Sequence, residues 1–404
     1  MTGQYDLIVI GAGIHGAGTA QAAAAAGYSV LVLEQSGIAS ATSCRSSKLI
    51  HGGLRYLESG QLNLVRESLR ERDILLRIAP QLVRLVPFHI PVYRHTARRP
   101  WQIRAGLSLY AILGNLRRHA RFATLPRSQW NGLDGLATEN LQTVFRYQDA
   151  QTDDAALTQA VMRSAQSLGA ELVVPGAFLG AQRSAHGYAV RYHTPQGEAE
   201  SHCAALVNAS GPWINGVLAR IAPHVPPPAI ELVQGTHIVL DGALRHGVYY
   251  TEAEDGRAVF VMPWRGMTLV GTTETRFRGD PAQVRPQTAE VEYLLRTFRR
   301  YFPQRDAQLR DQFAGLRVLP LTESAAFRPP WMAEVPETQE QFFGHRPRET
   351  LFPTDVPQQP HLVSICGGKL TGYRATAQKV LALLAPTLPA RTQRGDTRTL
   401  PLSP

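Results

Sequence analysis

Two short apolar runs near the start of the chain enclose an alanine-rich stretch. Residues 7–10 and 29–33 have the uninterrupted apolar character of strands that are buried on both faces. The stretch between them starts at a cluster of glycines and ends at Gly27, so it is expected to be a helix that stops where glycine permits a left-handed turn. The pattern predicts a strand, a helix and a second strand parallel to the first.

The same alternation continues through the first half of the chain. Apolar residues recur at helical spacing in two polar stretches, and short apolar or alternating runs predict strands beyond them. Pro195-Gln196-Gly197 has the composition of a hairpin turn, and Gly211 with Pro212 is expected to open a helix. The expected helices cover residues 61–78 and 153–168, and the expected strands cover residues 171–174, 188–192 and 204–208.

A proline-rich segment at residues 223–228 (PHVPPP) interrupts this pattern and predicts the entry to a second domain. The apolar period beyond it is close to two, which predicts an antiparallel sheet with helices. Residues 329–360 are rich in proline, glutamine and glutamate, so we expect a long surface excursion there. The expected strands cover residues 234–240, 258–262, 267–271, 312–318 and 361–365, and the expected helices cover residues 288–301 and 373–384.

The predicted fold class is therefore α/β plus α+β, with two domains. A Rossmann-like nucleotide-binding domain, discontinuous in sequence, is expected to comprise residues 1–90, 145–228 and 361–390. An antiparallel-sheet substrate or cap domain is expected to comprise residues 91–144 and 229–360.

Three glycines and one acid in the first predicted unit specify a dinucleotide site. Gly11 permits the tight turn, Gly13 lets the backbone approach a pyrophosphate, and Gly16 lets the helix pack closely on the strand. The N-terminal end of the helix offers free N–H groups and a positive dipole end to phosphates. Glu34 ends the second strand, where a carboxylate accepts hydrogen bonds from the adenosine ribose hydroxyls.

A polar segment at residues 36–53 follows this acid, so it is expected to pass beside the nucleotide. The segment and the residues just after it hold many hydrogen-bond donors and one titratable base. These residues are Ser46, Ser47, Lys48, His51, Arg55 and Tyr56. Cys44, Cys203 and Cys366 are isolated from one another, which predicts neither a disulfide framework nor a metal site.

Charge and hydropathy add a hypothesis about partners. The net charge is +10, and residues 74–133 contain ten arginines but no acid. Residues 101–116 form an apolar, helix-compatible segment with arginines at both ends, which suits either a core helix with solvated basic flanks or contact with an anionic membrane surface. This basic segment, residues 94–121, is not expected to bind nucleic acid. No apolar run is long enough to span a bilayer and no basic leader precedes the first strand, so a cytoplasmic location is predicted, with contact at the inner face of the cell membrane as an option.

Several motifs identify a family. The glycine fingerprint and these motifs closely resemble FAD-dependent glycerol-3-phosphate dehydrogenases, within the flavin amine and hydroxy-acid oxidase superfamily, over nearly the whole chain. The longer members carry a C-terminal helical domain that this chain is expected to lack. The motifs are ATSCRSSKLIHGGLRYLE at residues 41–58, VNASGPW at 207–213, GTTE at 271–274, GLRVLP at 315–320 and CGGKLTGYR at 366–374.

The resemblance implies FAD as cofactor and oxidation of sn-glycerol 3-phosphate to dihydroxyacetone phosphate, with hydride transfer to flavin N5 and electrons passed to a membrane quinone. Arginine suits the substrate phosphate because its planar fork binds two oxygens, and the candidates are Arg55, Arg317 and the less closely matched Arg348. His51 is the first choice for the base that takes the hydroxyl proton. His237 is its rival, although its alternating strand context favours a structural histidine.

The other site predictions concern the flavin. Lys369 is expected to be a point charge that stabilises the reduced ring, so it counts with His51 and Arg317 among the catalytic candidates. Tyr56 and Thr371 are expected to donate hydrogen bonds to phosphate or flavin. The predicted cofactor-binding residues are Gly11, Gly13, Gly16, Glu34, Thr42, Ser43, Ser46, Ser47, Gly211, Gly368, Lys369, Leu370 and Thr371.

Three other functions stay open from the sequence. A flavin oxidase of another small acid, such as a 2-hydroxy acid or an amino acid, shares the cofactor fingerprint. An oxygen-using glycerophosphate oxidase differs only in its electron acceptor. A non-catalytic flavin-binding regulator is the remaining alternative, and the presence of His51, Lys369 and both motif arginines speaks against it. The sequence does not predict the oligomeric state.

Overall fold

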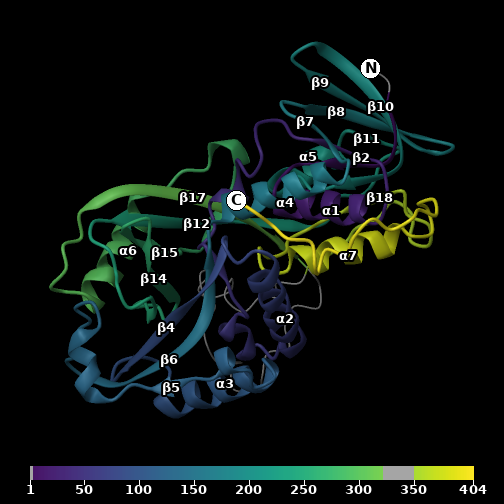
Figure 1. The fold of residues 1–404 in the computed structure, drawn as a ribbon. Helices are drawn as coiled ribbons and strands as arrows, with labels where there is room; N and C mark the ends of the chain where they lie inside the picture. Colours follow the sequence, from purple (N-terminus) through teal and green to yellow (C-terminus); the bar gives the residue numbers. More distant parts are fainter. Residues whose placement is uncertain (1–2, 322–349) are drawn as a thin grey trace.

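Two β-sheets organise the molecule, and the chain passes between them several times (Figure 1). The computed structural model describes residues 3–321 and 350–404. Within those residues, one sheet has eight strands and the other has ten. In Figure 1 the first sheet and its helices lie at the upper right, and the second sheet lies at the lower left with α3 and α6. The predicted fold class is confirmed, since one sheet is largely parallel and the other is largely antiparallel.

The first sheet has the strand order β11-β8-β9-β10-β1-β2-β7, and β18 pairs with β10. Strands β1, β2, β7, β10 and β18 are parallel to one another, whereas β8, β9 and β10 form an antiparallel meander. The strands are β1 (Gly3–Ile10), β2 (Val30–Leu33), β7 (Glu171–Val173), β8 (Ala177–Ser184), β9 (Gly187–Thr194), β10 (Gly197–Asn208), β11 (Ile221–Ala222) and β18 (Leu362–Ser364).

Successive residues of the central strand face two different cores. Leu7 and Val9 pack with α1, α4 and α7, whereas Ile8 and Ile10 pack on the opposite face with α5 and the β8–β9 hairpin. All of these side chains are buried, so the strand has to be apolar at every position. The helices that cover the sheet are α1 (Ile14–Ala25), α4 (Asp154–Ser167), α5 (Ile214–Leu218) and α7 (Tyr373–Leu384).

The second sheet has the order β16-β12-β15-β14-β13-β4-β6-β3, with β17 paired to β12 and β5 paired to β6. Helix α6 (Thr288–Tyr301) covers one face, and α2 (Leu62–Ile78) and α3 (Pro100–Leu113) cover the other. The strands are β3 (Leu49–Ile50), β4 (Val83–Tyr93), β5 (Ala123–Thr124), β6 (Leu141–Thr152), β12 (Ile230–Leu240), β13 (Val248–Glu252), β14 (Ala258–Trp264), β15 (Met267–Gly271), β16 (Thr275–Phe277) and β17 (Leu309–Pro320).

The longest strand pair that the hydrophobic pattern does not predict is β4 with β6. Pro87 and Pro91 interrupt the strand signal of β4, since proline removes a ladder donor, and the arginines around it give the segment a polar appearance. The predicted domain boundaries at residues 90 and 144 lie inside β4 and β6, and both strands belong to the second sheet along their whole length. The division of the chain into domains stays a prediction.

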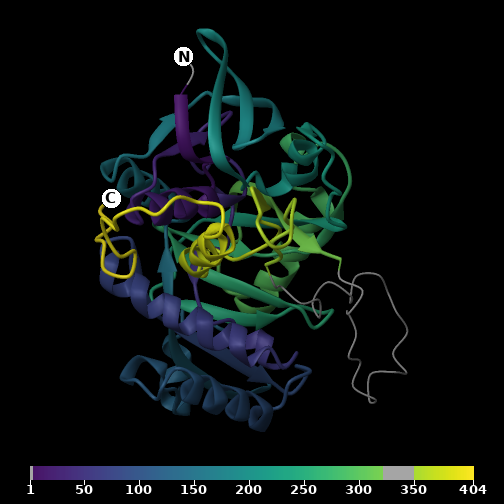
Figure 2. The same cartoon turned by 90° about the vertical axis from the view of Figure 1, so that its right-hand side faces the viewer.

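The segment after α7 folds back over the helices of the first sheet (Figure 2). The amide nitrogens of Arg394 and Leu402 donate to the carbonyls of Ala25 and Ile78, at the C-terminal ends of α1 and α2. These bonds satisfy carbonyls that a helix leaves without an internal partner.

The predicted excursion at residues 329–360 lies outside the described residues as far as position 349, and so does Arg348. Among residues 3–321 and 350–404, no helix combines the length and the apolar character that crossing a bilayer requires.

Candidate active site

The glycine turn after β1 closes against neighbouring backbone. Gly11 has a φ of +100°, and a Cβ there would lie 2.8 Å from the carbonyl oxygen of Ala209. Gly13 precedes α1, and a Cβ there would lie 3.1 Å from the hydroxyl of Ser43, which accepts a 2.9 Å hydrogen bond from the Ile14 amide. Gly11 is therefore required by its backbone conformation and its close neighbour, whereas a side chain at position 13 would crowd the Ser43 hydroxyl. The turn puts the positive end of α1 at the carboxyl ends of the parallel strands, where nucleotide phosphates bind.

Glu34 stands beside this turn and is buried. One carboxylate oxygen accepts a 2.8 Å hydrogen bond from the amide of Ala12, and the other accepts a 2.9 Å bond from the amide of Ser36. These bonds fix the carboxylate between the glycine turn and the next loop. A carboxylate has about four acceptor positions, so it retains capacity for a ribose hydroxyl.

The ends of two later strands return to the same place. The amide of Ala209, just after β10, donates to the carbonyl of Ile10 over 2.9 Å, and Ile365 after β18 donates to Asn208 over 2.9 Å. Gly211 has a φ of +56°, and a Cβ there would meet no atom within 4 Å. Gly368 has a φ of +104° and lies against the ring of His15 on α1. Four sequence-distant segments thus surround the N-terminal end of α1.

The loop at residues 42–48 is tied to both sheets. Thr42 donates its hydroxyl proton to the Leu316 carbonyl on β17 over 2.8 Å. Lys48 is buried with a φ of +59°, and its ammonium donates to Asp154 over 2.7 Å. Ser46 donates to the same aspartate from its amide (2.9 Å) and its hydroxyl (2.6 Å). Asp154 starts α4, so this buried carboxylate links the loop to the helix layer of the first sheet.

A buried carboxylate joins two of the predicted phosphate-binding arginines. Glu274 accepts a 2.8 Å hydrogen bond from Arg317, and its other oxygen lies 3.7 Å from the guanidinium of Arg55. The Glu274 side chain is 4% exposed, whereas both arginines are 24% exposed. The guanidinium of Arg317 also donates to the Thr272 hydroxyl over 3.2 Å. Both arginines therefore contact Glu274, and both side chains are partly exposed to solvent.

His237 lies on β12 close to Arg317 and is 2% exposed. Its Nε2 lies 2.9 Å from the hydroxyl of Ser47, and its ring stacks on Phe313 at a centroid distance of 4.9 Å. Burial, with smaller effects from the positive charges of Arg317 and Lys48, lowers the pKa of His237 to about 3. The imidazole is therefore neutral at physiological pH.

His51 and Lys369 come together through the backbone of two loops. The amide of His51 donates to the Thr371 hydroxyl over 3.2 Å, and the His51 ring lies edge-on to Phe260 at 6.1 Å. The ammonium of Lys369 lies 3.5 Å from the centre of the Tyr56 ring, a cation–π contact. The 51–56 segment and the 366–371 loop are therefore in direct contact.

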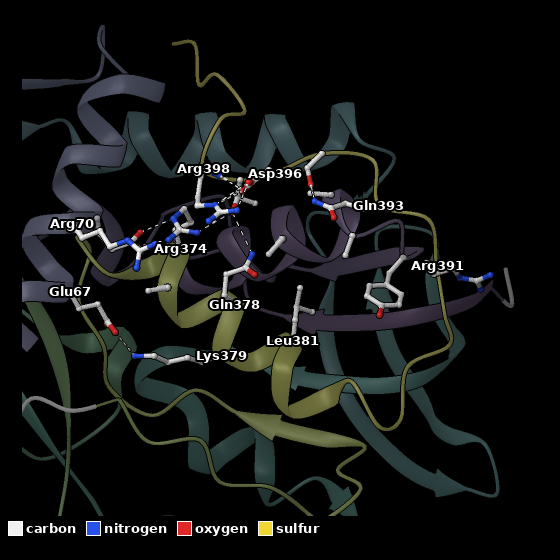
Figure 3. Close-up of a pocket in the computed structure, with 18 of the residues that line it drawn as sticks. Glu67, Arg70, Arg374, Gln378, Lys379, Leu381, Arg391, Gln393, Asp396 and Arg398 are labelled. Carbon is white, nitrogen blue, oxygen red and sulfur yellow. Dashed lines mark hydrogen bonds and ion pairs between the residues drawn. The ribbon is translucent and has the colours of Figure 1, made fainter. Parts of the chain in front are cut away.

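A solvent-open pocket of about 890 Å³ lies elsewhere, between α1, α2, α7 and residues 391–398 (Figure 3). Of the described site candidates, none lines it. Three of its cations pair with acids that also line it: Arg374 with Glu71, Lys379 with Glu67, and Arg398 with Asp396. The pocket is a junction between helices and not the candidate active site.

The structure therefore gathers most of the predicted residues into connected contacts, where the 42–57 segment and the 366–371 loop meet the glycine turn and the second sheet. Ser46 is a predicted cofactor-binding residue, but its amide and its hydroxyl both donate to Asp154. Glu274 is the residue that the site prediction missed. The GTTE motif contains it, but nothing in that motif indicates that its carboxylate bridges Arg55 and Arg317.

The chain is similar in sequence and in structure to known proteins. Residues 6–369 match the family model of FAD dependent oxidoreductases. The chain is 37% identical to a glycerol-3-phosphate dehydrogenase of Pseudomonas aeruginosa, over 95% of this chain and 72% of that protein. It is 32% identical to a D-erythritol 1-phosphate dehydrogenase of Brucella abortus, over 93% and 72% of the two chains. The structure is similar to that of glycerol-3-phosphate dehydrogenase from Bacillus halodurans complexed with FAD, with a TM-score of 0.73, 26% identity, and coverage of 99% of this chain and 68% of that chain.

Proposed function

Since this chain belongs to the FAD-dependent oxidoreductases, and within them to the glycerol-3-phosphate dehydrogenase family, we propose that it oxidises sn-glycerol 3-phosphate to dihydroxyacetone phosphate and passes the electrons to a quinone. FAD, when bound, accepts the hydride from C2 of the substrate. The observation that carries the proposal is the pair of arginines on Glu274.

The residues around the glycine turn and the 366–371 loop fit FAD. Gly13 leaves the space that a Cβ would fill at the positive end of α1, where the pyrophosphate would be held. Glu34 is positioned for the ribose hydroxyls, and Gly211 has open space beside it. Lys369 and Thr371 lie on the loop that contacts the His51 segment, so they would hold the flavin end.

Arg55 and Arg317 would bind the phosphate of the substrate. Glu274 holds each guanidinium on one side, and both side chains keep about a quarter of their surface exposed. A planar guanidinium suits phosphate because its fork of donors binds two oxygens at once. The related D-erythritol 1-phosphate dehydrogenase is named for another phosphorylated polyol, which agrees with a phosphate-binding role for these arginines. Tyr56, His237 and Arg348 are proposed as further substrate-binding residues.

His51 would take the proton of the C2 hydroxyl. It closely precedes η2 (Leu54–Leu57), which contains Arg55, and its amide contacts the 366–371 loop, so it is linked to a proposed phosphate-binding residue and to the proposed flavin-binding loop. Its backbone is fixed by Thr371 and its ring contacts Phe260. Lys369 supplies a positive charge on the flavin side.

The acceptor proposal depends on α3. Trp101 is 68% exposed and Ile112 is 59% exposed on the outer face of this helix, and Leu116 just beyond it is 56% exposed. In the described part of the chain, the nearby Arg104 and Arg121 make no ion pair with an acid. Apolar side chains flanked by cations fit an anionic bilayer, in which a quinone is dissolved.

The first experiment is anaerobic mixing of the purified yellow protein with glycerol 3-phosphate, followed by absorbance at the visible flavin maximum. Bleaching is expected with glycerol 3-phosphate and not with glycerol, because the latter lacks the phosphate that the arginines bind. Persistent yellow colour with glycerol 3-phosphate but bleaching with D-erythritol phosphate or a 2-hydroxy acid would transfer the proposal to that substrate. Peroxide formed stoichiometrically in air would replace quinone by oxygen as the acceptor.

A further inference from the structure

A phenolic hydroxyl lies directly behind the residue that follows His51. The backbone amide of Gly52 donates a 2.8 Å hydrogen bond to the hydroxyl of Tyr110, and both groups are buried. Tyr110 comes from the inner face of α3 and is 1% exposed. A Cβ at position 52 would collide with this hydroxyl, so the glycine lets the two chains approach. The Gly52 amide is therefore held by a side chain of a distant helix.

The hydroxyl is itself held by a buried ion pair. Tyr110 donates its proton to Asp149 on β6 over 2.5 Å. The other carboxylate oxygen of Asp149 accepts a 2.7 Å hydrogen bond from Arg72 on α2. Asp149 is 1% exposed and Arg72 is 0% exposed. The Gly52 amide is thus linked through Tyr110 of α3 and Asp149 of β6 to Arg72 of α2.

This arrangement is costly if packing is its only purpose. The surroundings of Tyr110 are apolar, with Leu69, Leu107 and Leu113 in the same cluster. A buried ion pair is often no better than apolar side chains of similar volume, because both charges have to be desolvated. The hydrogen bonds from Arg72 to Asp149 and from Tyr110 to Asp149 do, however, fix the direction of the Tyr110 hydroxyl, which apolar residues could not do. The hydroxyl in turn fixes the plane of the Gly52 peptide.

We infer that Arg72, Asp149 and Tyr110 form a positioning chain that fixes the backbone beside His51 in the orientation needed for proton removal. The inference rests on the proposed role of His51. None of the three residues is a catalytic residue, because they act through the Gly52 peptide. Arg72 orients Asp149, Asp149 orients the Tyr110 hydroxyl, and that hydroxyl holds the Gly52 amide.

The test compares Tyr110→Phe with Tyr147→Phe in the FAD-loaded protein. Tyr147 is 4% exposed in the same cluster and packs edge-on against Tyr110 at 5.9 Å, but it makes no bond to Gly52. Stopped-flow flavin reduction by glycerol 3-phosphate gives the reduction rate constant and the substrate Kd separately. We expect Tyr110→Phe to lower the rate constant about 10- to 100-fold, the effect of a small misplacement of a reacting group, with Kd within about twofold. Tyr147→Phe should leave both values near those of the parent protein.

A second readout does not need turnover. Hydrogen exchange of peptides that cover residues 49–57 reports on the Gly52 amide directly, in the absence of substrate. We expect exchange there to be about tenfold faster in Tyr110→Phe and unchanged in Tyr147→Phe. A thermal melt checks that both variants are folded.

The outcomes separate this inference from the proposed function. If the parent protein is not reduced by glycerol 3-phosphate, the proposed substrate is wrong, and the exchange data alone decide whether Tyr110 fixes the turn. If the parent protein is reduced and Tyr110→Phe keeps the rate constant of Tyr147→Phe, the positioning role is wrong. Equal exchange at residues 49–57 in both variants also overturns it.

Discussion

Two histidines border the candidate substrate site, and their surroundings give them different chemistry. His237 is buried between Ser47 and Phe313, and its lowered pKa of about 3 makes it a neutral hydrogen-bonding group. The ring of His51 is partly exposed and lies on the segment that joins the flavin loop to Arg55. A base must reach its substrate and then release the proton to water, so His51 suits that task better than a fully enclosed imidazole.

Replacement of His51 tests this assignment. His51→Gln should lower the rate constant of flavin reduction by about 10²- to 10⁴-fold, the usual contribution of a general base, while the flavin content stays unchanged. Stopped-flow absorbance measures the rate and the protein-bound flavin spectrum measures the content. His186→Gln, at the exposed β8–β9 turn, is the matched control. A His51→Gln rate within threefold of the control would assign the base elsewhere.

The lowered pKa of His237 predicts a pH dependence of stability. Below a pH of about 6.5 the unfolded chain binds a proton at this side chain, whereas the folded protein binds it only near pH 3. The unfolded state therefore binds more protons in this window, and the free energy of unfolding falls as the pH is lowered. His237→Gln should make that slope shallower by up to about 1.4 kcal/mol per pH unit between pH 6 and 4. Urea denaturation at several pH values measures it, and parallel slopes for both proteins would contradict it.

At the scale of single elements, the N-terminal end of α6 organises the substrate side of the second sheet. Glu290 in its first turn is buried, and its carboxylate accepts hydrogen bonds from side chains of β12, the GTTE loop and β16. Thr273 is one of these donors, and it stands between Thr272 and Glu274, which both contact Arg317. The donors are Gln234 (2.5 Å), Thr236 (2.7 Å), Thr273 (2.7 Å), Thr275 (2.9 Å) and the amide of Gln287 (3.1 Å).

Glu290→Gln should loosen this loop, because an amide has one acceptor oxygen where the carboxylate has two. The arginine that depends on the loop would be less well oriented, so we expect KM for glycerol 3-phosphate to rise about tenfold, with a smaller change in kcat. Steady-state kinetics with an artificial acceptor measure both constants. Glu292→Gln, on the same helix but 61% exposed, should match the parent protein, and an unchanged KM in Glu290→Gln would exclude the role of the loop.

These elements also show what the sequence can predict. The βαβ unit with Gly11, Gly13 and Glu34 is local, so its glycine and apolar patterns determine it within about 30 residues. The approach of Arg55, Glu274 and Arg317 depends instead on the register of β12 with β17 and on the return of the 42–57 segment to the second sheet. The hydrophobic period contains no information on such long-range pairing, and the two prolines of β4 weaken its strand pattern. The sequence therefore does not predict the contacts of Glu274 with the two arginines or the contact of Tyr110 with Gly52.

At the scale of the whole molecule, α3 has a buried inner face and an exposed outer face. Its inner residues Leu107, Tyr110 and Leu113 are buried, whereas Trp101 and Ile112 point outward. The helix therefore separates its exposed outer face from the turn beside His51. The apolar segment at residues 101–116 is helical from Pro100 to Leu113, and contact with a membrane stays a proposal.

Liposome binding tests this surface. Trp101→Glu with Ile112→Glu should abolish cosedimentation with anionic vesicles at low salt, because both substitutions put negative charge on the side that would enter the lipid interface. Binding of the parent protein should weaken as salt is raised, since the arginine contribution is screened. Leu383→Glu, at an exposed apolar position of α7, controls for added charge. Equal binding by the double variant and this control would rule out α3 as the contact.

The strand order of the first sheet has a consequence for the nascent chain on the ribosome. Strand β1 lies between β2, which follows it within 30 residues, and β10, which pairs with it about 200 residues later. At roughly 5–20 residues per second, β10 leaves the ribosome about 10–40 s after β1. During that time one edge of an apolar strand has no partner, which is the condition under which chains pair wrongly or recruit chaperones. The cofactor site at the end of β1 is therefore among the first segments to be made and among the last to be completed.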